Sequence, residues 1–326
     1  MAGVHLRGGQ GAVRRALAAL LHAHLVESPG PGDVVIDLAG PIPERRARWI
    51  ADLEAGRHVL STSLDPRDAQ WAANLWHDRA VRDGLVLLPN AAMGAVLGDV
   101  LGALAADAVG AATDVHTAHL IAERGGVRAV AGAAWRAEIA ALLGTPSLAR
   151  DHDRLIEEPW GERRRLAWFA RPVGPHHAAS IPCPEVVTIA RHVPASTITG
   201  HLAMSSWQAE ALQAWAGLNR HASIERWSQA RLARNRNGMS DARWALVSEA
   251  RGSQGVARAW TNGRNPAAVT AAILDILARR VLEVSGTLGG ALAPAQLIEP
   301  KELLDAASAQ VDLRWSIVRP EQSAGQ

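Results

Sequence analysis

The chain has 326 residues, 48% of them hydrophobic, and a formal net charge of +2, so it is long enough for two domains with a sizeable core. Its apolar runs are too short to span a membrane, and its single cysteine, Cys183, excludes an internal disulfide framework. The absence of tyrosine excludes Tyr-x-x-x-Lys hydride-transfer chemistry. We expect a cytoplasmic protein that binds neither membranes nor nucleic acid, because the arginine-rich runs lack interleaved aromatic residues.

Strands and helices alternate in the N-terminal part of the chain. Residues 34–38 (VVIDL) and 58–63 (HVLSTS) predict buried strands, and residues 44–56 between them predict a helix. Residues 66–84 predict a further helix that leads into a strand at residues 85–89. This alternation is typical of a doubly wound parallel sheet.

The pattern changes after residue 90. The remaining segments predict a strand at 112–122, a helix at 127–144, an irregular stretch at 145–184, strands at 185–193 and 196–204, helices over 206–231, a hairpin at 242–263, a helix at 265–283 and a last strand at 312–318. We therefore expect an α/β protein: a shortened Rossmann-like parallel sheet and a second α/β domain carrying a mixed or antiparallel sheet. The predicted divisions are 1–112 for the truncated Rossmann-like domain, 113–264 for a substrate-binding and dimerisation domain, and 265–326 for a C-terminal helix and strand that return to the first domain.

Five segments in order resemble the saccharopine dehydrogenase-like family of oxidoreductases. They are DVVIDLAGP (33–41), LEAGRHVLSTSLD (53–65), LVLLPNAAMGAVLGDVLGALAA (85–106), PCPEVVTIARHVPASTITGHLAM (182–204) and GGALAPAQLIEPKELLDA (289–306). The resemblance covers nearly the whole chain. It implies a Rossmann domain that binds NADP or NAD, a second domain that binds a small-molecule substrate, and a homodimer.

The front end departs from the family pattern, which places three strands before the segment at 33–41. Here only 32 residues precede it. In one alignment, residues 4–6 are a degenerate first strand, Gly8, Gly9 and Gly11 form the phosphate turn, and Glu27 is the ribose partner; Arg14 then replaces the third glycine. In the other, residues 4–6 are the third strand and the phosphate-binding front end is absent. We favour the second alignment, because only a short apolar stretch precedes the glycines.

By the resemblance, the cofactor would lie against the ends of three successive strands. The implied cofactor-binding residues are Ala39, Gly40, Pro41, Ser61, Thr62 and Asn90. Structural roles compete with this interpretation: Ser63 or Asp65 could cap the helix that begins at Pro66, and Gly40 could serve a plain tight turn.

The catalytic candidates are His119, His192 and Asp99. The two histidines fall on predicted strands of the second domain and are the best candidates for proton transfer. Asp99 lies in the segment that would face the cleft between domains, although it could instead cap a helix N-terminus. The thirteen histidines form no metal motif, and His116 and His119 would point to opposite faces of a strand, so no metal site is expected.

The sequence thus predicts an NAD(P)-dependent oxidoreductase that reduces a C=N or C=C bond of a small metabolite. The alternative is a relative that has lost dinucleotide binding and acts as a non-redox enzyme, or as a subunit that binds a metabolite or partner. The short front end and Arg14 favour the alternative, whereas the retained cleft-forming segments favour the oxidoreductase.

Overall fold

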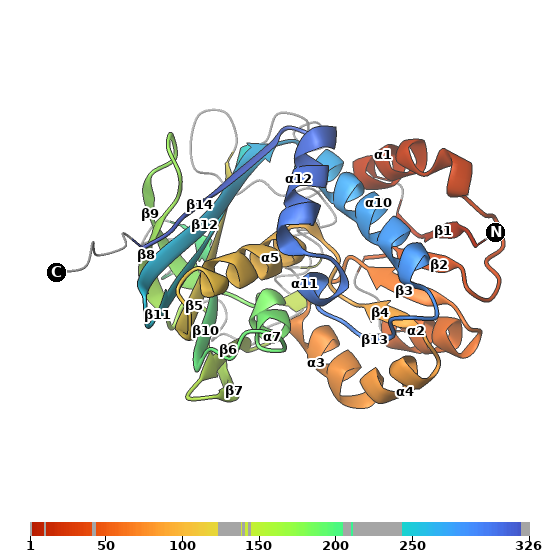
Figure 1. Ribbon diagram of the computed structural model, residues 1–326, viewed down its shortest axis with the longest axis horizontal. Coiled ribbons are helices and arrows are strands. Elements are labelled where there is room, and N and C mark those ends of the chain that lie inside the picture. Colours follow the sequence, from red (N-terminus) through yellow and green to blue (C-terminus); the bar gives the residue numbers. More distant parts are fainter. Residues whose placement is uncertain are drawn as a thin grey trace.

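The computed structural model describes residues 2–9, 11–40, 44–122, 138, 141–142, 145–204, 210 and 243–320. Over these residues the chain is a mixed α/β protein with two sheets (Figure 1). The first sheet contains β1 (Val4–Arg7), β2 (Val34–Asp37), β3 (His58–Ser61), β4 (Val86–Leu88) and β13 (Gly290–Ala291). Its helices are α1 (Ala12–Leu20), α2 (Arg45–Glu54), α3 (Pro66–Leu75), α4 (His77–Arg82) and α10 (Pro266–Val284), with a short 3₁₀ helix at His22–His24. The α/β class predicted from the sequence is confirmed.

The first sheet is parallel throughout, in the order β1-β2-β3-β4-β13. Its strands are short and buried on both faces, as expected when helices cover both sides. All five strands therefore direct their carboxyl ends to the same edge, which is the edge where open α/β sheets bind ligands.

The position of β1 decides between the two alignments of the front end. β1 pairs with β2, and on its other side Leu25 forms a single parallel bridge to Val4, where the amide of Val26 donates to the carbonyl of Val4 at 3.0 Å. In the dinucleotide-binding order 3-2-1-4-5-6, the first strand lies between the second and the fourth. β1 thus occupies the position of a first strand, and the favoured assignment to a third strand is wrong. The second strand is reduced to the bridge at Leu25.

The second sheet is mixed and has nine strands. They are β5 (Ala112–Ala122), β6 (Ser147–Asp151), β7 (Arg154–Glu158), β8 (Arg164–Trp168), β9 (Pro175–Ser180), β10 (Thr197–Ala203), β11 (Arg243–Gly252), β12 (Gly255–Arg264) and β14 (Leu313–Val318). The helices on this side are α5 (Met93–Asp107), α7 (Glu185–Ile189), α11 (Pro294–Leu297) and α12 (Pro300–Gln310). β10 runs parallel to β5, whereas β11 pairs with β5 and β12 in the antiparallel sense.

Three expectations for the second half differ from the structure. The segment 185–193, predicted to be a strand, begins with the helix α7. All five residues of α7 are buried. Because no face of this short helix is exposed, its sequence lacks the alternation of buried and exposed positions that distinguishes a helix from a strand. The stretch 145–184, predicted to be irregular, contains the strands β6 to β9. The helices predicted at 127–144 and 206–231 fall largely outside the described residues.

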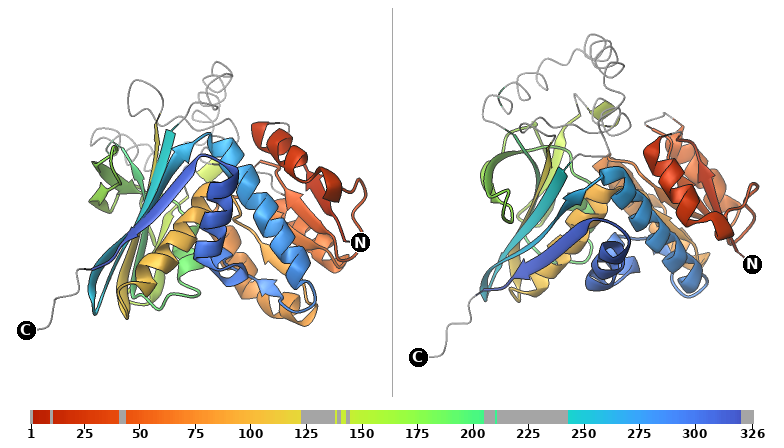
Figure 2. Two further views of the ribbon diagram at one scale, coloured as in Figure 1. Left: turned by 45° about the horizontal axis from the view of Figure 1, so that its top comes forward. Right: turned by 90° about the horizontal axis from the view of Figure 1, so that it is seen from above.

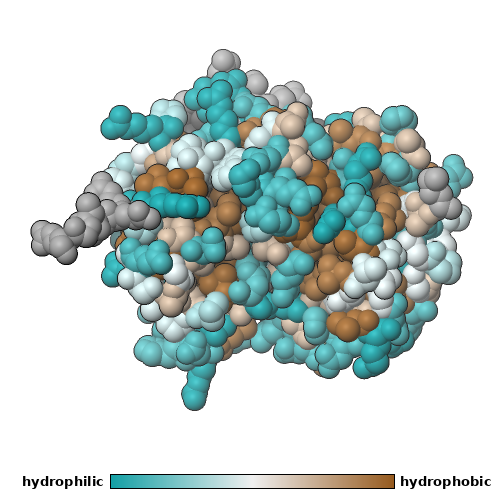
Figure 3. Space-filling view, viewed as in Figure 1, coloured by the Kyte–Doolittle hydropathy of each residue, from teal (hydrophilic) through white to brown (hydrophobic). Residues whose placement is uncertain are grey.

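The C-terminal segment serves both sheets. Helix α10 packs on α1 and β2, and both views in Figure 2 place it between the two sheets. The sequence predicted that the C-terminal helix and strand both return to the first domain. β13 does join the first sheet beside β4, but the last strand, β14, pairs with β12 in the second sheet. On the face shown in Figure 3, hydrophobic residues are most visible over the half of the molecule that carries α1 and α10. The predicted domain boundaries stay predictions.

Candidate functional site

The turn after β1 packs directly on the end of β2. Gly8 and Gly9 have φ of 65° and 64°, in the left-handed region that favours glycine. A Cβ on Gly8 would lie 3.0 Å from Ala39, and a Cβ on Gly9 would lie 3.0 Å from the Cβ of Leu38. Both glycines are therefore required by the close packing of two strand ends at the carboxyl edge.

Two other glycines at this edge have no such internal reason. Gly11 precedes α1 with φ −85°, and none of the described atoms lies within 4 Å of a Cβ built on it. The same is true of Gly40, beyond the end of β2. No described residue other than the chain neighbours therefore fills the space beside either glycine, and a larger side chain at either position would enter the space beside it.

Arg14 brings a positive charge to this turn. Its guanidinium donates to the carbonyls of Leu6 and Gly8, both at 2.8 Å. It replaces the third glycine of a dinucleotide-binding turn, which normally permits close packing of helix and strand. Glu27 is exposed and follows the bridge at Leu25, as an acidic ribose partner would follow a second strand.

The predicted cofactor residues at the ends of β3 and β4 are occupied by structural contacts. The side-chain amide of Asn90 donates to the carbonyl of Ser63 at 2.8 Å and to that of Asp65 at 3.1 Å, and its backbone bridges Thr62. Asp65 accepts from the amide of Arg67 at 3.0 Å, which confirms the predicted helix cap.

Of the other predicted cofactor residues, Ser61 ends β3, and Ala39 and Gly40 follow β2. The Ser61 side chain is fully buried, and its hydroxyl has no partner among the described residues. The amide of Ala39 donates to the Asp37 carboxylate at 3.0 Å, and Pro41 lies outside the described residues.

Two catalytic candidates, His192 and Asp99, form a direct pair. His192 Nε2 lies 2.9 Å from Asp99 Oδ1, while Asp99 Oδ2 accepts from the amide of Ala295 in α11 at 2.9 Å. Asp99 is fully buried, and both of its carboxylate oxygens accept or share a hydrogen bond. Its contact with Ala295 lies at the N-terminus of α11, so the predicted capping role applies to α11 and not to α5. His192 lies in the turn after α7 and not on a strand, but it keeps 14% of its side chain exposed.

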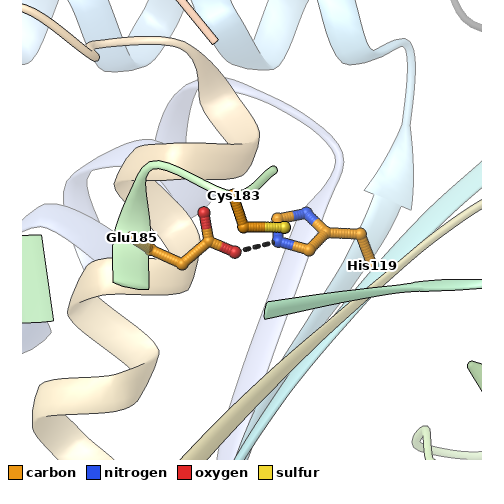
Figure 4. A group of neighbouring side chains, drawn as sticks. All are labelled: His119, Cys183 and Glu185. Atoms are coloured by element: carbon orange, nitrogen blue, oxygen red, sulfur yellow. Dashed lines mark hydrogen bonds and ion pairs between the residues drawn. The ribbon is translucent and has the colours of Figure 1, made fainter. Parts of the chain in front are cut away.

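The third candidate, His119, belongs to a different group of side chains. His119 Nε2 contacts Glu185 Oε1, which also accepts from the Thr117 hydroxyl at 2.9 Å (Figure 4). The thiol of Cys183 lies beside both residues, and burial, followed by the nearby Glu185 carboxylate, raises the pKa of this thiol. The thiol is therefore protonated and not a ready nucleophile.

Two other histidines, His116 on β5 and His201 on the neighbouring strand β10, lie close together. His116 Nδ1 lies 2.6 Å from the Thr199 hydroxyl, whereas His119 faces α5 and α7, so the prediction that these two histidines point to opposite faces is confirmed. His201 approaches the carbonyl of Thr117 at 3.0 Å through Nδ1. Burial lowers the pKa of His116 to about 4 and that of His201 to about 3, so both are neutral at pH 7.

Neither Glu185 nor Thr117 is among the site residues predicted from the sequence. The period of two in residues 112–122 does place Thr117 on the same face as His119. Glu185, however, is 66 residues from His119, and its segment was expected to be a strand, so no local pattern connected the two.

Comparisons with known proteins place the fold only in general terms. No family model and no curated protein matches the chain, so the resemblance to the saccharopine dehydrogenase-like family stays a prediction. Three dehydrogenase structures are similar along most of the chain. They are a C. glutamicum DAP dehydrogenase in complex with DAP (12% identity, 95% of this chain and 98% of that chain, TM-score 0.45), a meso-dapdh mutant with DAP from Clostridium tetani E88 (12%, 93% and 96%, 0.45), and an engineered D-amino acid dehydrogenase bound to NADP+ (13%, 92% and 97%, 0.41).

At these identities and TM-scores the likeness carries no functional argument, and the strand order of the chain itself establishes the α/β architecture. No helix among the described residues is long and apolar enough to cross a membrane.

Proposed function

We propose that the chain is an NAD(P)-dependent oxidoreductase that reduces a C=N or C=C bond of a small metabolite. The observation that carries the proposal is the glycine turn of β1, which lies on the end of β2 at the carboxyl edge of a parallel sheet. Ligands of open α/β sheets bind at this edge, and helix N-termini there hold phosphate groups.

The residues at this edge fit a dinucleotide in three respects. Gly8 and Gly9 hold the turn against β2, and Gly11 and Gly40 leave open space where a phosphate and a ribose would approach the backbone. Glu27 follows the remnant of a second strand, in the place of the acidic residue that binds a ribose hydroxyl. The bound nicotinamide would supply the hydride, and the protein would orient it against the substrate.

His192 is the proposed proton donor. Asp99 holds its Nε2, and the backbone amide of Ala295 fixes Asp99 in turn, so the ring is oriented as a general acid requires. His192→Gln should therefore lower kcat and remove one limb of its pH profile, while leaving nucleotide affinity unchanged. An unchanged profile would show that His192 has no part in proton transfer.

A second function is favoured by Arg14 and by the reduction of the second strand to the bridge at Leu25. Arg14 donates into the turn where a pyrophosphate would need close backbone approach, so the chain could instead bind a metabolite without a dinucleotide, or act through non-redox chemistry.

Calorimetric titration with NADH and NADPH separates the two functions. Saturable micromolar binding that Gly11→Val and Gly40→Val each weaken by about tenfold or more would support the oxidoreductase. Gly30→Val is the matched control, because Gly30 precedes β2 at the opposite edge, and among the described atoms only an Asp33 oxygen, at 3.8 Å, approaches a Cβ built on it. Absence of binding at millimolar nucleotide would refute the proposal for this chain.

A further inference from the structure

We propose that His119, Cys183 and Glu185 bind one divalent metal ion, with Zn²⁺ as the ion of best fit. One ligand atom from each of the three residues lies within 4.8 Å of the other two. They come from β5, from the segment after β9 and from the start of α7, and they converge at the first turns of α5 (Figure 4). This inference is independent of the dinucleotide site.

The donor set selects the class of metal. A thiolate, an imidazole and a carboxylate are ligands that Zn²⁺ accepts together, whereas Mg²⁺ and Ca²⁺ require oxygen ligands almost exclusively. Three protein ligands leave the fourth tetrahedral position for water or substrate, which is the arrangement of catalytic rather than structural zinc sites.

The charge and hydrogen bonding of Glu185 give a second, separate argument. Its side chain is fully buried, and Oε2 has no hydrogen-bond partner among the described residues. A buried carboxylate with an unpartnered oxygen is costly unless a cation compensates it. Binding would displace the proton that the Cys183 thiol carries in the metal-free chain. Zn²⁺ bound by one thiolate, one carboxylate and a neutral imidazole forms a group with no net charge.

The surroundings hold the three ligands in place. A Cβ on Gly98 would lie 2.9 Å from Glu185 Cγ, and a Cβ on Gly200 would lie 2.8 Å from Cys183 Sγ. A Cβ on Gly94 would lie 3.2 Å from His119 Nδ1. Glycine at these positions lets the backbones of α5 and β10 enclose the cluster.

The contacts around Glu185 also resemble the outer shell of a metal site. The Thr117 hydroxyl donates to Glu185 Oε1 and orients it, and such outer partners typically change metal affinity by about 10- to 100-fold when removed.

The test uses the full-length, tag-free protein, stripped of metal and titrated with Zn²⁺ by calorimetry. Cys183 is the only cysteine in the chain, so a thiolate-to-metal charge-transfer band after Co²⁺ substitution can come only from that residue. We expect one ion per chain and a Co²⁺ band in the wild type, both lost in Cys183→Ser and His119→Gln. Thr117→Val should weaken Zn²⁺ binding by about 10-fold or more.

His116→Gln is the matched control, because His116 lies on the same strand but faces the other side. It should retain both the stoichiometry and the band. Absence of the band in wild-type protein would overturn the proposal even if the variants fail to fold, as would Zn²⁺ binding that persists without Cys183 and His119. Nucleotide titration of the same samples reports on the oxidoreductase separately.

Discussion

Gly200 on β10 offers a direct test of how the Cys183 cluster is packed. A Cβ on Gly200 would lie 2.3 Å from the Cβ of Cys183, far inside the roughly 3.5–4.0 Å contact distance of two carbon atoms. Both Cβ atoms are fixed to their backbones, so no rotamer change relieves the overlap. Overpacking of a core costs about 1–3 kcal/mol, offset by the roughly 0.5–1 kcal/mol gained when alanine replaces glycine within a strand. Because the overlap is this deep, the upper end of the overpacking range applies, and we expect Gly200→Ala to lower the free energy of unfolding by about 2 kcal/mol after the gain from alanine.

Urea unfolding measures this change as a lower midpoint with an unchanged slope. The decisive comparison is a pair of double mutants. Cys183→Ala keeps the clashing Cβ, so in that background Gly200→Ala should cost about as much as in the wild type. Cys183→Gly removes the clashing Cβ, so in that background the cost of Gly200→Ala should fall below about 1 kcal/mol. Equal costs in the two backgrounds would refute the reasoning. Gly40→Ala serves as the control, because apart from its chain neighbours no atom of the part of the chain that the structure describes lies within 4 Å of a Cβ built there, and it should change stability by less than about 0.5 kcal/mol.

Three further predictions concern buried polar groups. Arg45→Met should lower the free energy of unfolding by about 3–5 kcal/mol, because it removes the arginine that contacts the buried Glu138 carboxylate and one of the two arginines that contact Asp68. Arg46→Met removes only the half-exposed second arginine of Asp68 and should cost about 1 kcal/mol or less in the same unfolding assay. Burial lowers the pKa of His201 to about 3, so below pH 6.5 the unfolded chain binds a proton that the folded chain does not. The free energy of unfolding therefore decreases as the pH is lowered. His201→Asn should remove about 1.5 kcal/mol of the loss between pH 6.5 and about pH 5; an unchanged pH slope would contradict this. Asn90→Asp cannot donate to the two loop carbonyls and should cost about 1–3 kcal/mol, with or without nucleotide present; full stability would show that the amide contacts contribute nothing.

The sequence by itself determined the local features of this protein. Buried runs such as residues 34–38, with helices between them, predicted the parallel sheet, and Asp65 before Pro66 predicted a capped helix. The period of two in β5 placed His116 and His119 on opposite faces. Each of these features depends on residues that are neighbours along the chain, so periodicity and capping chemistry are sufficient to predict them.

Only the tertiary structure decided which distant residues meet. The glycine turn could belong to a first or a third strand until β1 was found beside β2, because strand order depends on pairing between segments about 30 residues apart. The short run at 185–189 has no pattern that distinguishes a helix from a strand, and packing against α5 and β10 selected the helix. His119 and Glu185, and likewise His192 and Asp99, are separated by 66 and 93 residues. Their contacts exist because two sheets and α5 bring the segments together, and no local pattern encodes that approach.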